Sequence, residues 1–157
     1  MSIYLVLKWL HVLSSTVLFG TGIGIAFFKW MADRGGDVAT IRRINEITVF
    51  ADWVFTTPAV IAQPASGLGL MLVEGYPMST PWIVAGFALY FLAGACWLPV
   101  VWLQLEMRNM ARRAERDGGP LPQRYRQLAR RWFFLGMPAF TALAIVFWLM
   151  VAKPALW

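Results

Sequence analysis

His11 is the single histidine of this chain, and its imidazole can take more chemical roles than any other side chain here. An imidazole nitrogen can ligate a metal such as haem iron, or it can hydrogen-bond to a neighbouring helix. With one histidine and one cysteine, Cys96, the chain cannot build a site from two imidazoles, a cysteine-based zinc site or an internal disulfide. Cys96 is expected to be a small packed residue. Two roles stay open for His11: an iron ligand, or a hydrogen-bonding residue between helices.

Two further polar residues share a helical face with His11. Lys8 and Ser15 lie three and four residues from it, the spacing that brings side chains onto one side of a helix. Lys8 either extends its ammonium group to the membrane surface or pairs with an anionic group such as a haem propionate.

Gln63, Tyr90 and Trp148 belong to later apolar segments, and their depth in a membrane follows from the rise of about 1.5 Å per residue. Counted from the nearer ends of the segments, His11 lies roughly 12 Å deep, and Gln63 and Tyr90 lie about as deep. Lys8 and Trp148 lie one turn nearer the surface. This layer predicts haem b between the helices, with His11 as the metal ligand and a cofactor-binding set of His11, Lys8, Ser15, Gln63, Tyr90 and Trp148. In the other interpretation, Gln63 or Tyr90 is only the hydrogen-bond partner of His11.

Asp52 is the one charged residue of its apolar segment. A carboxylate within a membrane span is costly unless it is paired. We expect Asp52 to pair with a basic residue near the cytoplasmic end of its helix, and a place in a proton path is the alternative.

The elements that must position these residues are long apolar helices. Of the 157 residues, 59% are hydrophobic and only 14% are charged, and the mean hydropathy is +0.60. Because about 20 apolar residues cross a bilayer, the sequence predicts four spans, at about 3–28, 47–73, 81–105 and 132–152. Prolines inside spans free a backbone carbonyl four residues earlier and bend the helix. We expect an all-α bundle of four transmembrane helices with proline kinks, as a single integral-membrane domain over 1–157.

The basic residues predict how the bundle is oriented. Eight of the fourteen lysines and arginines lie in the segment 108–131, and others surround the first loop, whereas the loop 74–80 contains none. Cytoplasmic loops carry the excess of basic residues, so both termini are expected in the periplasm and the basic loop 108–131 in the cytoplasm. The net charge of +6 is thereby explained by topology and does not indicate nucleic-acid binding. The loop itself is expected to continue the third span as a basic helix, to break at 117–120 and to resume as a second basic stretch.

Five blocks of the sequence carry a resemblance to a known family: residues 7–13, 20–24, 51–58, 96–101 and 132–140. Together they resemble a bacterial family of predicted integral membrane proteins, a domain-of-unknown-function family, over nearly the whole chain. That family is more distantly similar to the copper-resistance protein D group and to the membrane protoporphyrinogen oxidase. Those proteins open with a Lys-x-x-His pattern, which matches Lys8 and His11 here. The resemblance implies a haem b bundle in which His11 ligates iron and Lys8 assists.

The chain departs from the distant relatives in two ways: it lacks their histidines in later spans, and its third span has no basic residue. A haem with two histidine ligands from one protomer is therefore impossible. What remains is one histidine with an open or weak sixth position, or two protomers that share a haem.

We expect a protein of the bacterial inner membrane that binds haem b through one histidine and has a redox or porphyrin-related role. If it is an enzyme, it is a membrane oxidoreductase. Expected partners are the lipid bilayer, a quinone or porphyrin, and a second copy or a larger membrane complex. One alternative is copper or small-molecule transport, which Met71 and Met78 at the outer end favour. Another is a non-catalytic accessory subunit of a membrane complex.

Overall fold

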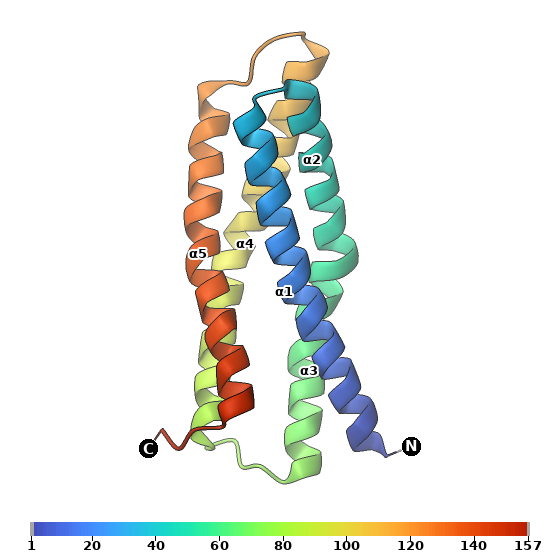
Figure 1. Cartoon of the computed structure of the whole chain (residues 1–157), viewed down its shortest axis with the longest axis vertical. Helices are drawn as coiled ribbons and strands as arrows, with labels where there is room; N and C mark the ends of the chain where they lie inside the picture. Colours follow the sequence, from blue (N-terminus) through green and yellow to red (C-terminus); the bar gives the residue numbers. More distant parts are fainter. Residues whose placement is uncertain (1, 157) are drawn as a thin grey trace.

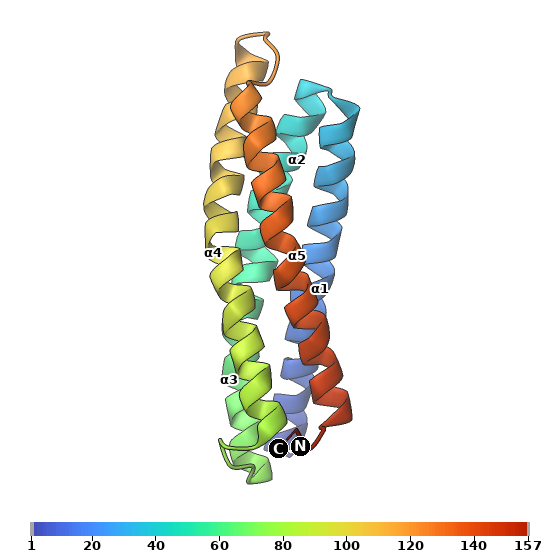
Figure 2. The ribbon, with the colours of Figure 1, turned by 90° about the vertical axis from the view of Figure 1, so that its left-hand side faces the viewer.

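The computed structural model describes residues 2–156, and this part of the chain contains helices and connecting turns but no strand. Four long antiparallel helices run side by side (Figures 1 and 2). The second of them runs without a gap, but a π-helical turn in its middle divides it into three labelled elements. The elements are α1 (Ile3–Gly35), α2 (Val38–Ala51), η1 (Asp52–Thr56), α3 (Thr57–Glu74), α4 (Pro81–Arg116) and α5 (Gln123–Ala152). The predicted all-α fold is confirmed.

Both termini lie at one end of the bundle, beside the 75–80 loop (Figure 1). We call this the terminal end. The opposite end carries the turns at 36–37 and 117–122, and we call it the basic end because most of the arginines surround it. The predicted continuation of the third span, its break near 117–120 and the helix that follows are all present as the end of α4 and the start of α5.

All four helices are long and apolar enough to cross a membrane. They are also longer than a crossing requires. The 33 residues of α1 extend about 50 Å, whereas the hydrocarbon core of a bilayer is about 30 Å thick. The predicted span limits at 28, 47, 105 and 132 therefore mark where the apolar pattern stops, and the helices continue past them toward the basic end.

Large apolar side chains cover the outside of the bundle, as a bilayer environment requires. Trp9, Phe91 and Phe134 are 63%, 68% and 71% exposed, and they lie on three different helices. In water such a surface would be unstable. The bilayer is therefore the environment of these helices.

The turn at the basic end between α1 and α2 is tight. Gly36 ends α1 in the left-handed conformation, with φ of 74°, which a residue without a Cβ adopts at little cost. Asp37 then caps α2, because its carboxylate accepts a hydrogen bond from the backbone N–H of Thr40 at 2.8 Å. Hydrogen bonding to Thr40 lowers the pKa of the Asp37 carboxyl below its ordinary value.

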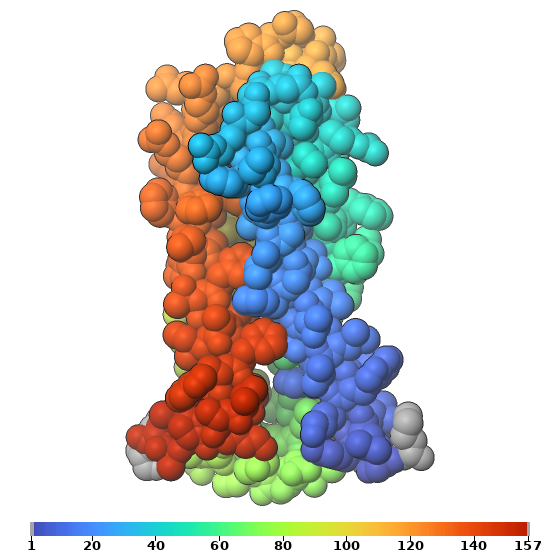
Figure 3. Space-filling view, viewed as in Figure 1, coloured from blue at the N-terminus to red at the C-terminus, as the bar shows by residue number. Residues whose placement is uncertain are grey.

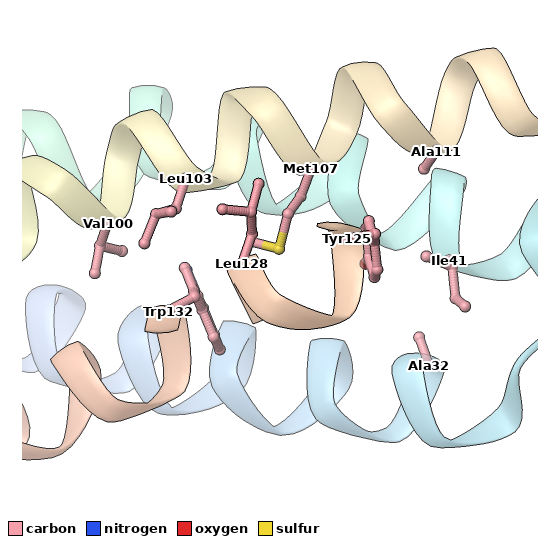
Figure 4. Close-up of a cluster of buried hydrophobic side chains, with 9 residues drawn as sticks. All are labelled: Ala32, Ile41, Val100, Leu103, Met107, Ala111, Tyr125, Leu128 and Trp132. Carbon is pink, nitrogen blue, oxygen red and sulfur yellow. The ribbon is translucent and has the colours of Figure 1, made fainter. Parts of the chain in front are cut away.

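The best-packed part of the molecule lies in its basic half. There α1, α2, α4 and α5 enclose a cluster of buried side chains (Figure 4), namely Ala32, Ile41, Val100, Leu103, Met107, Ala111, Tyr125, Leu128 and Trp132. Met107 and Ala111 of α4 have no exposed surface at all. Four helices meet here because small and large side chains interdigitate at this level.

A buried cluster of hydrogen-bonded polar side chains, called here the polar knot, joins three helices within this core. The ammonium group of Lys29, which is fully buried, donates to Asp33 at 3.0 Å and to the hydroxyl of Tyr125 at 2.9 Å. The Tyr125 hydroxyl in turn donates to Asp33 at 2.6 Å and accepts from Asn45 at 2.8 Å. The knot thus joins α1, α2 and α5 through one phenol oxygen.

The terminal half is more open than the basic half. There α1 packs on α3, and α4 packs on α5. Over the residues that the structure describes, no Cα atom of α3 lies within 8 Å of one in α4 or α5. Figure 3 shows the resulting hollow between α1 (blue) and α5 (red), with green atoms visible behind it. The bundle is therefore closed at one end and divided into two helix pairs at the other.

The polar knot predicts a strong effect of removing one oxygen atom. Tyr125→Phe keeps the ring but leaves Lys29, Asp33 and Asn45 with one partner fewer, so we expect the free energy of unfolding to fall by about 2–3 kcal/mol. Thermal or detergent-induced unfolding measures this change. Tyr76→Phe at the terminal end is the control and should change the unfolding free energy by less than about 0.5 kcal/mol. Equal effects of the two substitutions would show that the knot is not a major source of stability.

Candidate functional site

The hollow of the terminal half contains a cavity of about 310 Å³, which we call the terminal cavity. Its walls come from all four long helices and from the 75–80 loop. The polar residues of its lining are Tyr4, Lys8, His11, Gln63, Glu74, Tyr76, Tyr90 and Lys153. Apolar side chains such as Leu70, Phe87 and Val146 form most of the remaining wall. Four of the six predicted site residues, Lys8, His11, Gln63 and Tyr90, therefore line one space.

The imidazole of His11 lies between α1 and α3 and uses both of its nitrogens there. Nδ1 lies 3.0 Å from the hydroxyl of Ser66, and Nε2 lies 3.2 Å from the amide nitrogen of Gln63. The ring fits because α3 has a glycine at its point of closest approach. A Cβ on Gly67 would come within 3.1 Å of His11 Cε1.

One arrangement of the surrounding hydrogen bonds places the proton of His11 on Nδ1. The hydroxyl of Ser14 donates to the amide oxygen of Gln63 at 2.5 Å, so the amide nitrogen of Gln63 faces the ring and donates to Nε2. Ser66 donates its own proton to the carbonyl oxygen of Ala62 at 2.6 Å and accepts from Nδ1. In this arrangement the ring is neutral, with its proton on Nδ1 and its lone pair on Nε2.

Of the two partners predicted for His11, Gln63 is confirmed and Tyr90 is not. The polar spacing of the second span places Ser66 on the same face as Gln63, but spacing alone did not identify it as the second partner. Ser14 was missed, because the predicted seam of the first span passes through Ser15 instead. The rest of the predicted face is correct, since Lys8 and His11 line the terminal cavity.

Ser15 and Trp148 are not at the cavity, so their predicted site roles are corrected. The hydroxyl of Ser15 donates to the backbone carbonyl of Val12 within its own helix, at 2.8 Å. Trp148 is 57% exposed on the outside of α5. Its neighbour Met150 lines the cavity in its place. Both predictions failed because a shared depth does not determine which side of a helix faces the bundle interior.

Two lysines lie at the mouth of the terminal cavity. Lys8 of α1 donates to the hydroxyl of Tyr4 at 3.1 Å, and its pairing with an anionic ligand stays a prediction. Lys153 follows α5, and its ammonium group lies 5.5 Å and 5.6 Å from the ring centres of Tyr76 and Trp82. These two cations outnumber the single acid of the lining, Glu74, and so favour an anion at the mouth.

Tyr90 links the two helix pairs across the cavity. Its hydroxyl donates to the backbone carbonyl of Val60 at 2.7 Å. This carbonyl is free because Pro64, four residues later in α3, has no N–H to donate to it. The kink proline thus creates an acceptor inside the membrane, and Tyr90 of α4 satisfies it.

A second space, of about 180 Å³, lies deeper toward the basic end and is called here the central cavity. Asp52 and Thr56 of η1 line it, together with Gln104 and Trp97 of α4 and Trp132 of α5. Tyr90 belongs to the walls of both cavities. Cys96 lines neither of them and is partly buried, which agrees with a packing role.

Asp52 does not have the basic partner expected from the sequence. Its Oδ1 accepts a hydrogen bond from Thr56 at 2.7 Å, and within the described residues no lysine or arginine forms an ion pair with it. One basic residue near the end of its helix is engaged elsewhere. Arg42 pairs with Glu46 and Glu115 at 2.6 Å each.

The comparison with known families decides where this chain belongs. Residues 5–154 match the sequence profile of the family described as predicted integral membrane protein (DUF2269). The chain belongs to the DUF2269 family. The DUF2269 match includes the lining of both cavities except Tyr4. No curated protein and no solved structure matches the chain.

The link between Tyr90 and Val60 predicts a coupling between a tyrosine and a proline that do not share a helix. Tyr90→Phe should lower the free energy of unfolding by about 1 kcal/mol, because the Val60 carbonyl loses its partner. In a Pro64→Ala background the new N–H of residue 64 supplies that partner, so Tyr90→Phe should cost close to nothing there.

Pro138→Ala provides the matched background, because it restores an N–H in α5 away from Val60. Tyr90→Phe should cost as much in that background as in the wild type. Equal costs in all three backgrounds would contradict the proposed pairing of Tyr90 with the proline-freed carbonyl.

Proposed function

We propose that the protein binds haem b in the terminal cavity, with His11 as the axial ligand. The observation that carries this proposal is the position of His11 in the wall of the cavity, where the tautomer with its proton on Nδ1 and its lone pair on Nε2 satisfies both neighbouring groups. Ligation through Nε2 requires this tautomer, and ligating histidines characteristically donate their other N–H to a fixed acceptor. Ser66 is such an acceptor.

The residues present fit a haem on one condition. The amide of Gln63 covers the lone pair of Nε2, so it must turn away before iron can bind there. After this movement the amide oxygen of Gln63 can still accept a hydrogen bond from Ser14, and its amide nitrogen can turn toward the cavity. The cavity walls suit a flat apolar ring, and the lysines at the mouth suit its carboxylates.

Each of the chain's own residues then has a definite task. Ser66 holds the ring of His11 in orientation, and Gly67 leaves room for it. Lys8 and Lys153 hold carboxylate groups at the mouth. When bound, haem would supply a redox-active iron, and His11 would be the one imidazole that this chain offers to it.

A purely structural role for His11 is the second candidate, and one observation favours it. Both ring nitrogens already have hydrogen-bond partners on α3, so the imidazole joins two helices without any ligand. This is the behaviour expected of a non-catalytic accessory subunit.

Copper handling is a third candidate. It draws on Met71 and Met150, whose thioethers line the terminal cavity, whereas Met78 is on the exposed loop. No group of three or more His, Cys, Asp or Glu side chains in the described residues is arranged to hold a metal ion.

We further propose that the protein resides in the bacterial inner membrane with both termini in the periplasm. The basic residues around the turns at one end of the bundle support this orientation. The Lys8–His11 spacing supports the distant relationship to the copper-resistance protein D group and to membrane protoporphyrinogen oxidase. A porphyrin is then the expected partner, and a second copy of the chain is one source of a further ligand.

An optical spectrum of the purified protein tests the haem proposal. A Soret band is expected in the wild type, and His11→Ala should remove it or leave a weakly held haem. Gln63→Ala should raise haem occupancy, because nothing then covers Nε2. Ser15→Ala is the matched control and should change nothing, since Ser15 lies outside the cavity. Lys8→Ala should lower occupancy less than His11→Ala.

Three other results would reject haem ligation by His11. An unchanged haem spectrum in His11→Ala would assign the iron to another residue. Stoichiometric copper without haem would favour copper handling. If neither is bound and His11→Ala costs only about 0.6 kcal/mol of stability, the typical value for an intramembrane hydrogen bond, His11 is structural.

Reporter fusions test the orientation. A reporter that is active only in the periplasm should be active after residue 157 and inactive when inserted at Gly118 in the turn between α4 and α5. The arginines of that turn region hold it on the cytoplasmic side. The reverse pattern would place the terminal cavity at the cytoplasmic side.

A further inference from the structure

The central cavity contains a hydrogen-bond acceptor and a donor that nothing in the described residues satisfies. The Oδ2 atom of Asp52 and the Nε1 atom of Trp132 are both buried without a hydrogen bond of good geometry, although the side chain of Gln104 lies beside the carboxyl of Asp52. Asp52 is 7% exposed and Trp132 is 8% exposed, and both residues line this cavity. Buried polar atoms are nearly always paired, so an unpaired acceptor and donor at one cavity indicate a ligand that has both functions.

The rest of the cavity wall indicates the shape of that ligand. Trp97, Phe133 and Phe140 surround the space with aromatic rings, and the amide of Gln104 adds one polar group. The nearest cation is Lys29, which lies 5.6 Å from the ring centre of Trp132 but is committed to Asp33 and Tyr125. The cavity therefore suits a flat, uncharged ring with polar oxygens. Its described lining contains no lysine or arginine that could pair with an anionic ligand.

A groove on the lipid-facing side of the bundle lies next to this cavity. The groove has a volume of about 240 Å³ and runs between α4 and the η1 region of the second helix. Asp52, Trp97 and Gln104 line both spaces, so these side chains stand between the cavity and the groove and would have to move aside for a ligand that occupies both. At its outer edge the groove is bordered by Trp53 and Leu98, which are 62% and 66% exposed.

We propose that the central cavity binds the ring of a membrane-soluble quinol, with the hydrophobic tail lying in the lateral groove. One hydroxyl of the quinol donates to Asp52 Oδ2, and another ring oxygen accepts from the N–H of Trp132. The ring enters from the bilayer, past Trp53 and Leu98. This site is separate from the haem site of the proposed function, since His11 and Lys8 do not line it. It stands or falls independently of haem binding.

The hydrogen-bond functions also assign the redox state that binds better. A quinol has hydroxyl protons to donate to Asp52, whereas the oxidised quinone has only acceptor oxygens. The reduced form is therefore the tighter ligand of an ionised Asp52, whereas a protonated Asp52 would donate to the quinone instead. No electron transfer is part of the proposal, which concerns binding alone.

Calorimetric titration of the purified full-length protein with a decyl-substituted benzoquinol, kept reduced under anaerobic conditions, tests this site. We expect saturable binding, and we expect the corresponding quinone to bind about tenfold more weakly. Asp52→Leu and Trp132→Phe should each weaken quinol binding about tenfold, because each removes one hydrogen-bonding group. Two substitutions on different helices keep the test decisive if one of them prevents folding.

Two controls separate this site from other effects. Asp117→Asn changes an exposed acid at the basic end and should leave quinol binding unchanged. His11→Ala should also leave it unchanged, even if it abolishes haem binding. The proposal is overturned if the wild type does not bind, if the cavity variants bind like the wild type, or if quinol and quinone bind equally.

Discussion

Burial of the Lys29 ammonium group is the constraint on which the rest of the structure depends. Taking a charge out of water costs several kcal/mol unless its hydrogen bonds are replaced. Here Asp33, the Tyr125 hydroxyl and the rings of Tyr125 and Trp132 replace them. Because these groups lie on α1 and α5, and Asn45 adds α2, the charge is satisfied only when the three helices have one relative position. That position determines where the long helices point over the remainder of their length.

The two halves of the bundle divide the requirements of stability and of ligand binding. The basic half has interdigitated side chains, a buried ion pair and a surface network in which Glu46 joins Arg42 to Arg112. The terminal half has two helix pairs with a cavity between them, and Tyr90 is the residue whose hydroxyl bridges α4 to α3. Polar side chains such as His11 and Gln63 can face a cavity there because the other half supplies the stability.

The sequence was sufficient for the fold and for part of the candidate site. Apolar length and the placement of arginines predict four helices and put both termini at one end, as found. Depth counting brings Lys8, His11, Gln63 and Tyr90 together, because rise along a helix axis is nearly constant. It failed for Ser15 and Trp148, since the rotation of a helix about its axis depends on packing. The hydrogen bond from Lys29 to Tyr125 was missed because Tyr125 lies on another helix, far away in the sequence. The lack of a basic partner for Asp52 could not be predicted either. It depends on Glu46 and Glu115, which lie near Arg42 in the folded chain and pair with it.

The four antiparallel helices pack closely at the basic end and separate into two pairs at the terminal end. When the angle between the two helix pairs changes, each pair moves further the greater its distance from the closely packed basic end. The gap between the α1/α3 pair and the α4/α5 pair therefore depends on how the helices cross at the basic end. The width of the terminal cavity is consequently a property of the whole molecule, and residues far from its walls help to set which molecules can enter it.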